Sequence, residues 1–99
     1  MATFLKLKEF DDWFKSQTPK VRAQIDARLL RLQESEHEGH IRRLSKILKE
    51  LKFNNGNRIY FTEKVVGGHL VILILGGNKN GQDKDIKKAQ KIAEQIHQD

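Results

Sequence analysis

Apolar residues recur along the chain at two spacings, every second residue as in strands and every three or four residues as in helices, and these spacings predict where the elements lie. Phe4, Leu5 and Leu7 alternate loosely with lysines, which favours a short first strand. Apolar positions three and four residues apart then predict two antiparallel helices over about residues 10–34. The second helix is expected to begin at Thr18-Pro19, because Thr caps a helix well and Pro needs no amide partner in the first turn.

The segment after the polar stretch Ser35–His40 fits two patterns. Leu44, Ile47, Leu48 and Leu51 have helical spacing. Residues 49–53, however, alternate between apolar and charged side chains, and the turn-forming Asn54–Asn57 follows them. The alternation and the turn favour a strand from about Ile47 to Phe53.

The last third of the chain predicts a hairpin followed by a helix. Arg58–Thr62 and His69–Leu75 read as strands joined through Gly67-Gly68. The second strand is almost entirely apolar, so it is expected to be central and covered on both faces. A glycine-rich loop, Gly76–Gly81, then leads to a closing helix over about Gln82–His97.

The predicted architecture is a single α+β domain over residues 1–99, in which an antiparallel sheet packs against helices in the order β-α-α-β-β-β-α. Absence of cysteine excludes a disulfide framework and a zinc finger. The longest apolar run, Leu70–Leu75, is far shorter than the ~18 residues of a membrane span. No signal-peptide pattern is present at the start, so a cytoplasmic location and no membrane association are expected.

The net charge of +6 is concentrated in one stretch. Residues 41–64 contain seven basic and two acidic side chains, a net charge of +5. Such segregation favours a polyanionic partner, the alternative being a charged face that only aids solubility. The basic residues of this stretch that are predicted to contact the polyanion are Arg42, Arg43, Lys46, Lys49 and Lys52.

Common catalytic patterns fit this sequence poorly. His37 and His40 lie close together beside acidic residues, but no third ligand stands at a recognisable spacing, so no metal and no cofactor are expected. The glycines of Gly76–Gly81 lack the Gly-Lys-Ser/Thr ending of a nucleotide-binding loop. Ser16, Ser35 and Ser45 lie in no nucleophile elbow.

Arg58, Tyr60 and Lys79 are the candidate catalytic residues. Arg58 and Tyr60 are two positions apart on one strand, so they share a face and can offer a phosphate-binding fork beside a stacking ring. The alternative is that Tyr60 packs at the edge of the core and that Arg58 pairs with Glu50 or Glu63. Lys79 follows the central strand, where the backbone can approach a phosphate closely.

Several motifs in order resemble the phage-derived, HigB-like branch of the RelE/ParE toxin superfamily, often called addiction module killer proteins. The resemblance covers about residues 4–95. The segments that carry it are Phe10-x-x-Trp13-Phe14, Ile25-x-x-Arg28-Leu29-x-Arg31-Leu32, Glu50-Leu51-Lys52-Phe53, Arg58-Ile59-Tyr60-Phe61 and Leu75-Gly76-Gly77-Asn78-Lys79-x-x-Gln82-x-x-Asp85-Ile86-x-x-Ala89.

The resemblance implies a RelE-like fold and the toxin of a type II toxin–antitoxin module, which enters the ribosome and cuts mRNA. It also implies a cognate helix-turn-helix antitoxin as partner. Arg58 matches the phosphate-binding Arg of the sheet, Lys79 matches the Lys after the last strand, and Gln82 is added to the RNA-binding residues. Such an endoribonuclease needs no metal, because the RNA supplies its own 2′-hydroxyl nucleophile.

Two other functions remain open at this point. A non-enzymatic toxin that blocks DNA gyrase is one, because the superfamily holds both activities on one fold. A degenerate toxin that survives only as a basic RNA-binding module is the other.

Overall fold

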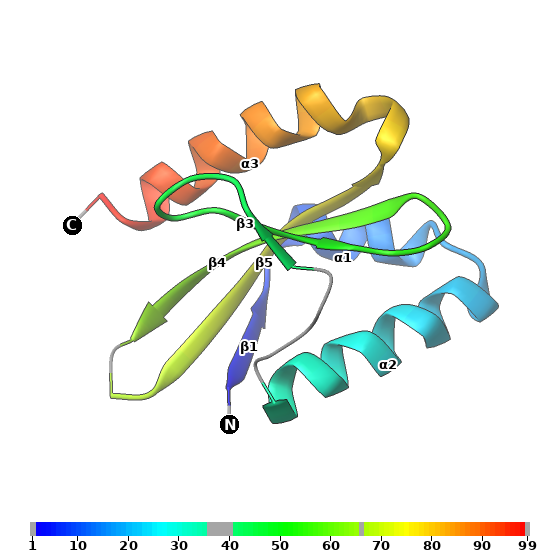
Figure 1. The fold of residues 1–99 in the computed structure, drawn as a ribbon, viewed down its shortest axis with the longest axis horizontal. Helices are drawn as coiled ribbons and strands as arrows, with labels where there is room; N and C mark the ends of the chain where they lie inside the picture. Colours follow the sequence, from blue (N-terminus) through cyan, green and yellow to red (C-terminus); the bar gives the residue numbers. More distant parts are fainter. Residues whose placement is uncertain (1, 36–40, 66, 99) are drawn as a thin grey trace.

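The computed structural model describes residues 2–35, 41–65 and 67–98 and consists of one sheet between two layers of helices (Figure 1). The sheet has five strands in the order β1-β5-β4-β3-β2. Helices α1 and α2 cover one face and α3 covers the other, which confirms the α+β class. The bounds are β1 Thr3–Lys6, α1 Lys8–Lys15, α2 Pro19–Ser35, β2 Ile41–Arg43, β3 Lys49–Lys52, β4 Asn57–Val65, β5 His69–Asn78 and α3 Gln82–Ile96, with a 3₁₀ turn η1 at Lys79–Gly81.

The first helix layer forms as its spacing predicts. In α1, Phe10 is fully buried and stacks at 6.0 Å on Phe14, which places the aromatic stripe in the core rather than on an RNA-stacking surface. The hydroxyl of Thr18 accepts a hydrogen bond of 3.2 Å from the backbone of Val21 and so caps α2 as expected. The α2 residues Ile25, Leu29 and Leu32 then pack against the sheet.

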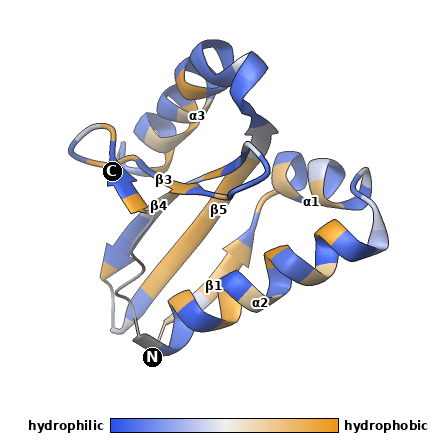
Figure 2. Cartoon of the chain, turned by 45° about the vertical axis from the view of Figure 1, so that its right-hand side comes forward, coloured by the Kyte–Doolittle hydropathy of each residue, from blue (hydrophilic) through white to orange (hydrophobic). Residues whose placement is uncertain are grey.

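The sheet is antiparallel except at one edge, where β1 pairs in parallel with β5. The almost entirely apolar β5 is paired on both sides and covered on both faces, although β4 and not β5 occupies the middle of the sheet. Figure 2 shows this apolar strand between α3 and the α1–α2 layer. Gly67 and Gly68 form the predicted hairpin turn with φ angles of 64° and 152°, which favour glycine.

A bulge in β5 changes the faces of its side chains. Tyr60 pairs with Leu75, but its neighbour Phe61 pairs with Leu73, so Ile74 is the additional residue. Ile74 and Leu75 therefore both contribute to the cluster under α3, together with Ala89 and Ala93.

Two predicted boundaries were wrong. The strand expected to start at Ile47 starts at Lys49, and a short strand, β2, precedes it, so the order gains one strand. Gly76, Gly77 and Asn78 continue β5 instead of forming a loop, because Asn78 still pairs with Asn57 in the ladder. Among the described residues, no helix is long and apolar enough to cross a membrane.

Candidate nucleic-acid interface

Arg58 lies near the start of β4, held at two points. Its Nε is 3.4 Å from Oε2 of Glu50 in an ion pair, and its Nη1 donates a 2.9 Å hydrogen bond to the carbonyl of Gly56. The residue is only 7% exposed. Within the described residues, Nη2 has no protein hydrogen-bond partner, so one edge of the guanidinium remains available.

Glu50 is the centre of this arrangement and is 1% exposed. Besides Arg58, it pairs with Arg42 on β2, whose Nε lies 3.5 Å from Oε1. Gln82, the first residue of α3, donates a 2.9 Å hydrogen bond to Oε2. One carboxylate therefore joins β2, β3, β4 and α3, and it bears out the alternative that Arg58 pairs with Glu50.

Tyr60 lies where the sequence placed it, on the face of Arg58, but this face is not open. The ring is fully buried in the cluster under α3. Its hydroxyl has no hydrogen-bond partner among the described residues. Burial, followed by the carboxylates of Glu50 and Asp85, raises the pKa of Tyr60. The expectation of an exposed stacking ring at Tyr60 was wrong because α3 covers the ring, and burial bears out the alternative that Tyr60 packs in the core.

Lys79 projects from the η1 turn and is exposed. The Asn78 side chain accepts a 2.9 Å hydrogen bond from the backbone of Asn80 and fixes this turn. The stem of Lys79 lies over Gly56, since a β-carbon there would be 3.9 Å from its Cγ. Lys79 is thus beside the turn that holds Arg58.

Two further cations complete this surface. Lys52 pairs in register with Arg58 and is exposed, and Arg42 pairs with Glu50 and keeps 61% of its side chain exposed. Because directly paired residues share a face of the sheet, Arg42, Lys52 and Arg58 lie on one side of it. Together with Lys79 they are called the Arg58 patch.

The other predicted RNA-binding cations do not join the Arg58 patch. Arg43 and Lys49 pair with each other in the next row of the sheet, where alternation turns their side chains to the opposite face. Lys46 lies in the turn between β2 and β3. Although these cations are close in sequence, they do not gather into one surface around Arg58, because they alternate between the faces of the sheet and lie at two ends of it.

The position of Asp85 was not predicted from the sequence. A β-carbon at Gly77 would lie 2.1 Å from Oδ2 of Asp85, so the carboxylate occupies the space over this glycine. Gly77 pairs with Arg58, which places Asp85 at the edge of the candidate site. Burial raises the pKa of Asp85, while Lys88 and Lys84 lower it less. The Gly76-Gly77 pair was the sequence signal for this close packing, but it was interpreted as part of a loop.

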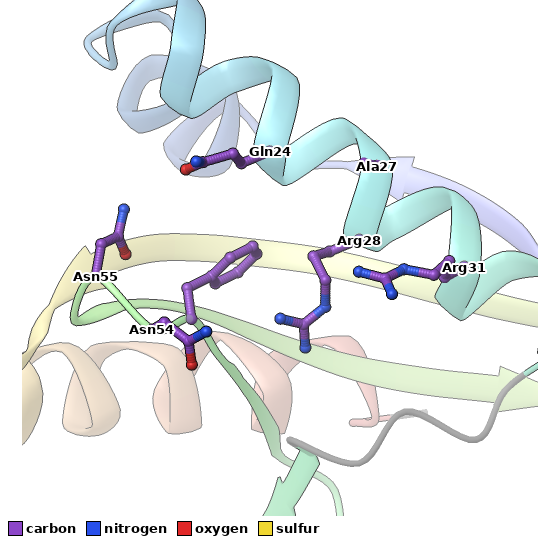
Figure 3. Close-up of a pocket in the computed structure, with 7 residues that line it drawn as sticks. Gln24, Ala27, Arg28, Arg31, Asn54 and Asn55 are labelled. Atoms are coloured by element: carbon purple, nitrogen blue, oxygen red, sulfur yellow. The ribbon is translucent and has the colours of Figure 1, made fainter.

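A cavity of about 350 Å³ lies between α2 and the β3–β4 turn (Figure 3). Its lining includes Gln24, Asn54, Asn55 and Phe53, and the Arg28 guanidinium lies 5.0 Å over the Phe53 ring. Phe53 belongs to the core cluster under α1 and α2, so this cavity opens on the face opposite Arg58 and is not part of the Arg58 patch.

His37 and His40 lie outside the described residues. Among the residues that the structure describes, no group of three or more His, Asp or Glu side chains could hold a metal ion.

A family model and a bacterial relative match most of this chain. The model of the family described as "Phage derived protein Gp49-like (DUF891)" matches residues 12–97. An uncharacterised protein of Haemophilus influenzae is 38% identical over 90 residues, which cover 88% of each chain.

Two solved structures share the fold. The RelE chain of the E. coli RelBE toxin–antitoxin complex superposes with a TM-score of 0.62 at 19% identity, covering 76% of this chain and 93% of that one. The isolated E. coli RelE toxin superposes with a TM-score of 0.60 at 15% identity, covering 86% and 95%. The resemblance to the RelE/ParE superfamily is thereby confirmed at the level of fold, and the chain belongs to the Gp49-like family of phage-derived proteins.

Proposed function

We propose that this protein is the toxin of a toxin–antitoxin pair and that it cuts mRNA on the ribosome at the Arg58 patch. The observation that carries the proposal is the fixation of Arg58. Two internal contacts, to Glu50 and to the Gly56 carbonyl, orient the guanidinium before any substrate arrives. Its Nη2 is left for a phosphate oxygen, with exposed cations around it.

The chemistry follows from the residue types in the patch. The 2′-hydroxyl gives its proton to solvent water and its oxygen attacks the adjacent phosphorus. The bond to the 5′-oxygen breaks and that oxygen takes up a proton, which leaves a 2′,3′-cyclic phosphate and a free 5′-hydroxyl. Arg58 stabilises the charge that develops on the phosphate oxygens. Lys79 is the cation placed to give a proton to the leaving oxygen, because arginine does not deprotonate in proteins and Tyr60 is buried. Arg42 and Lys52 hold the backbone on either side.

The partner proposed for this toxin is a small helix-turn-helix antitoxin. Support comes from the fold, because the RelE neighbour was solved in complex with its antitoxin. If a small helix-turn-helix reading frame adjoins this gene, its co-expressed product should restore growth and co-purify with this chain. Continued growth arrest without a stable complex would reject that partner.

A reconstituted translation system tests the proposed activity. Wild-type protein should cut mRNA on ribosomes, as primer extension detects, and Arg58→Ala should lower the single-turnover rate by about 10²-fold. Lys20→Ala, which removes an exposed positive charge on α2, serves as the matched control and should cleave normally. Intact mRNA in cells that nevertheless suffer gyrase-dependent DNA damage would overturn the proposal.

A further inference from the structure

A second group of cations surrounds a cavity at the other end of β4. The cavity has a volume of about 190 Å³ and is here called the Lys46 pocket; its lining residues are Arg43, Lys46, Ile47, Lys49, Glu63 and His97. Glu63 is five residues beyond Arg58 along β4, a separation of about 17 Å at the usual rise of a strand. One phosphate group therefore cannot contact both the Arg58 patch and the Lys46 pocket.

The charges in the Lys46 pocket are unbalanced. Three cations face one carboxylate, Glu63, which Lys49 already engages in an ion pair. Glu63 also contacts His69. Burial alone would raise the pKa of Glu63, but the hydrogen bonds from Lys49 and His69 outweigh it and lower the pKa, so this carboxylate stays ionised.

Among the described residues, the other two cations of the pocket make no ion pair with a carboxylate. Arg43 donates its Nη1 hydrogen bond to the main-chain carbonyl of Lys46, at 3.0 Å. Within the described residues, Lys46 itself makes no ion pair. Placing like charges around one cavity costs free energy, which a bound anion would recover. His97 contributes a ring whose Nε2 is hydrogen-bonded to Thr62, at 2.8 Å.

The turn that presents these cations is held in place. The Ser45 hydroxyl oxygen accepts hydrogen bonds from the backbones of Ile47 and Leu48, at 3.2 and 3.1 Å. It also donates to Oε1 of Gln90 on α3, at 2.8 Å. Because the turn is tied both to itself and to α3, Arg43 and Lys46 lose little additional conformational freedom on binding a ligand.

We propose that the Lys46 pocket binds a backbone phosphate of RNA, so that the protein grips RNA at two separate points; this inference rests on the proposed function. The phosphate oxygens accept hydrogen bonds from the Arg43 guanidinium and from the Lys46 and Lys49 ammonium groups. The site contributes affinity without taking part in the bond cleavage at Arg58. Its phosphate comes either from the mRNA that is cut or from ribosomal RNA.

The salt dependence of RNA binding tests the second site. Binding of a 2′-O-methyl RNA, which cannot be cleaved, is measured by fluorescence anisotropy over a range of KCl concentrations. Each phosphate contact to a single strand contributes about 0.7 to the slope of log K against log salt. Lys46→Ala should reduce the slope by about that amount, Lys46→Arg should restore it, and Lys20→Ala should leave it unchanged. An equal slope for Lys46→Ala and Lys20→Ala, on free RNA and on ribosomes alike, would overturn the inference.

Cleavage assays separate the two sources of phosphate and the two proposals. Lys46→Ala should raise KM without changing the single-turnover rate at saturation. Weaker binding of free RNA together with a higher KM on ribosomes identifies the mRNA strand, whereas a higher KM on ribosomes with unchanged binding of free RNA identifies ribosomal RNA. If Lys46→Ala weakens only antitoxin binding, the pocket serves a protein and the inference fails. If wild-type protein cuts no RNA but the slope difference persists, the proposed nuclease fails while the phosphate site stands.

Discussion

Nε2 of Gln82 donates to Oε2 of Glu50 at 2.9 Å, which attaches the first turn of α3 to the interior of the sheet. The same oxygen faces Arg58, so the helix, the carboxylate and the guanidinium form one connected unit. A buried unit of this kind stabilises the fold only while every member is present.

Replacing this carboxylate by an amide should separate stability, binding and catalysis. Glu50→Gln keeps the shape but removes the negative charge next to Arg58 and Arg42. We expect the free energy of unfolding to fall by about 1–3 kcal/mol, measured by urea denaturation. RNA should bind more tightly because an anion is lost, yet cleavage should slow because Arg58 is no longer oriented. Glu9→Gln, at an exposed position of α1, is the control. Unchanged cleavage in a stable Glu50→Gln protein would refute the orienting role.

Removing the hydroxyl of Tyr60 should leave activity intact. This buried hydroxyl has no hydrogen-bond partner among the described residues, so Tyr60→Phe loses no bond and avoids the cost of burying a polar group. Stability is expected to be unchanged or higher by about 1 kcal/mol, and the cleavage rate should equal that of the wild type. A well-folded Tyr60→Phe protein that no longer cleaves RNA would return Tyr60 to the catalytic residues.

The two glycines at the end of β5 should differ in their tolerance to alanine. A β-carbon at Gly76 would lie 2.2 Å from the ring of Trp13, a rigid side chain that packs against the core. Gly76→Ala should therefore cost about 1–3 kcal/mol of stability by overpacking. At Gly77 the obstructing atom is the end of the Asp85 side chain, at 2.1 Å, which can rotate away. Thermal unfolding should show the larger loss for Gly76→Ala, and the reverse order would contradict the packing argument.

Two carboxylates should affect the pH dependence of stability with opposite signs. The pKa of Glu63 lies below its ordinary value of 4.5, so its ionised form stabilises the folded state above that pH, and this contribution is lost as pH falls through the folded pKa. Glu63→Gln should consequently be less stable than the wild type at pH 7, with the difference shrinking toward acid pH.

Asp85 provides the matched contrast. Its pKa is raised above the ordinary value of 3.8, so ionisation disfavours the folded state as pH rises through that range. Asp85→Asn should gain stability relative to the wild type between acid and neutral pH, where Glu63→Gln loses it. Denaturation series at several pH values check both, and parallel curves for the two variants would refute the assignment.

Local signals were sufficient to predict most of the fold. The cap at Thr18 and the spacing of Ile25 and Leu29 specify a helix by themselves. The strand β2 escaped prediction because three residues are too few to show an alternating pattern. The Gly76-Gly77 pair was taken for a loop because glycine usually marks turns, whereas here it admits Trp13 and Asp85.

The site was harder to predict than the fold because it depends on what covers each face. Alternation correctly placed Arg58 and Tyr60 on one side of β4, but only the three-dimensional structure shows α3 lying over Tyr60. In the same way, a count of charges along residues 41–64 cannot reveal that Arg42 and Arg43 point to opposite faces. The assignment of Arg58, Lys79, Arg42, Lys52 and Gln82 to RNA binding or cleavage stays a prediction for the experiments above.

The additional residue in β5 limits how this chain can change length. Beyond Ile74 the pairing of β5 with β4 is shifted by one residue relative to the first part of the strand. Deleting one residue here would remove the bulge and leave Gly76 facing Trp13 and Gly77 facing α3, whereas inserting one would turn Gly76 toward α3 and Gly77 toward Trp13 unless a second bulge formed. A single deletion in this segment is therefore expected to be tolerated better than a single insertion, and natural insertions are expected to accumulate in the turns instead.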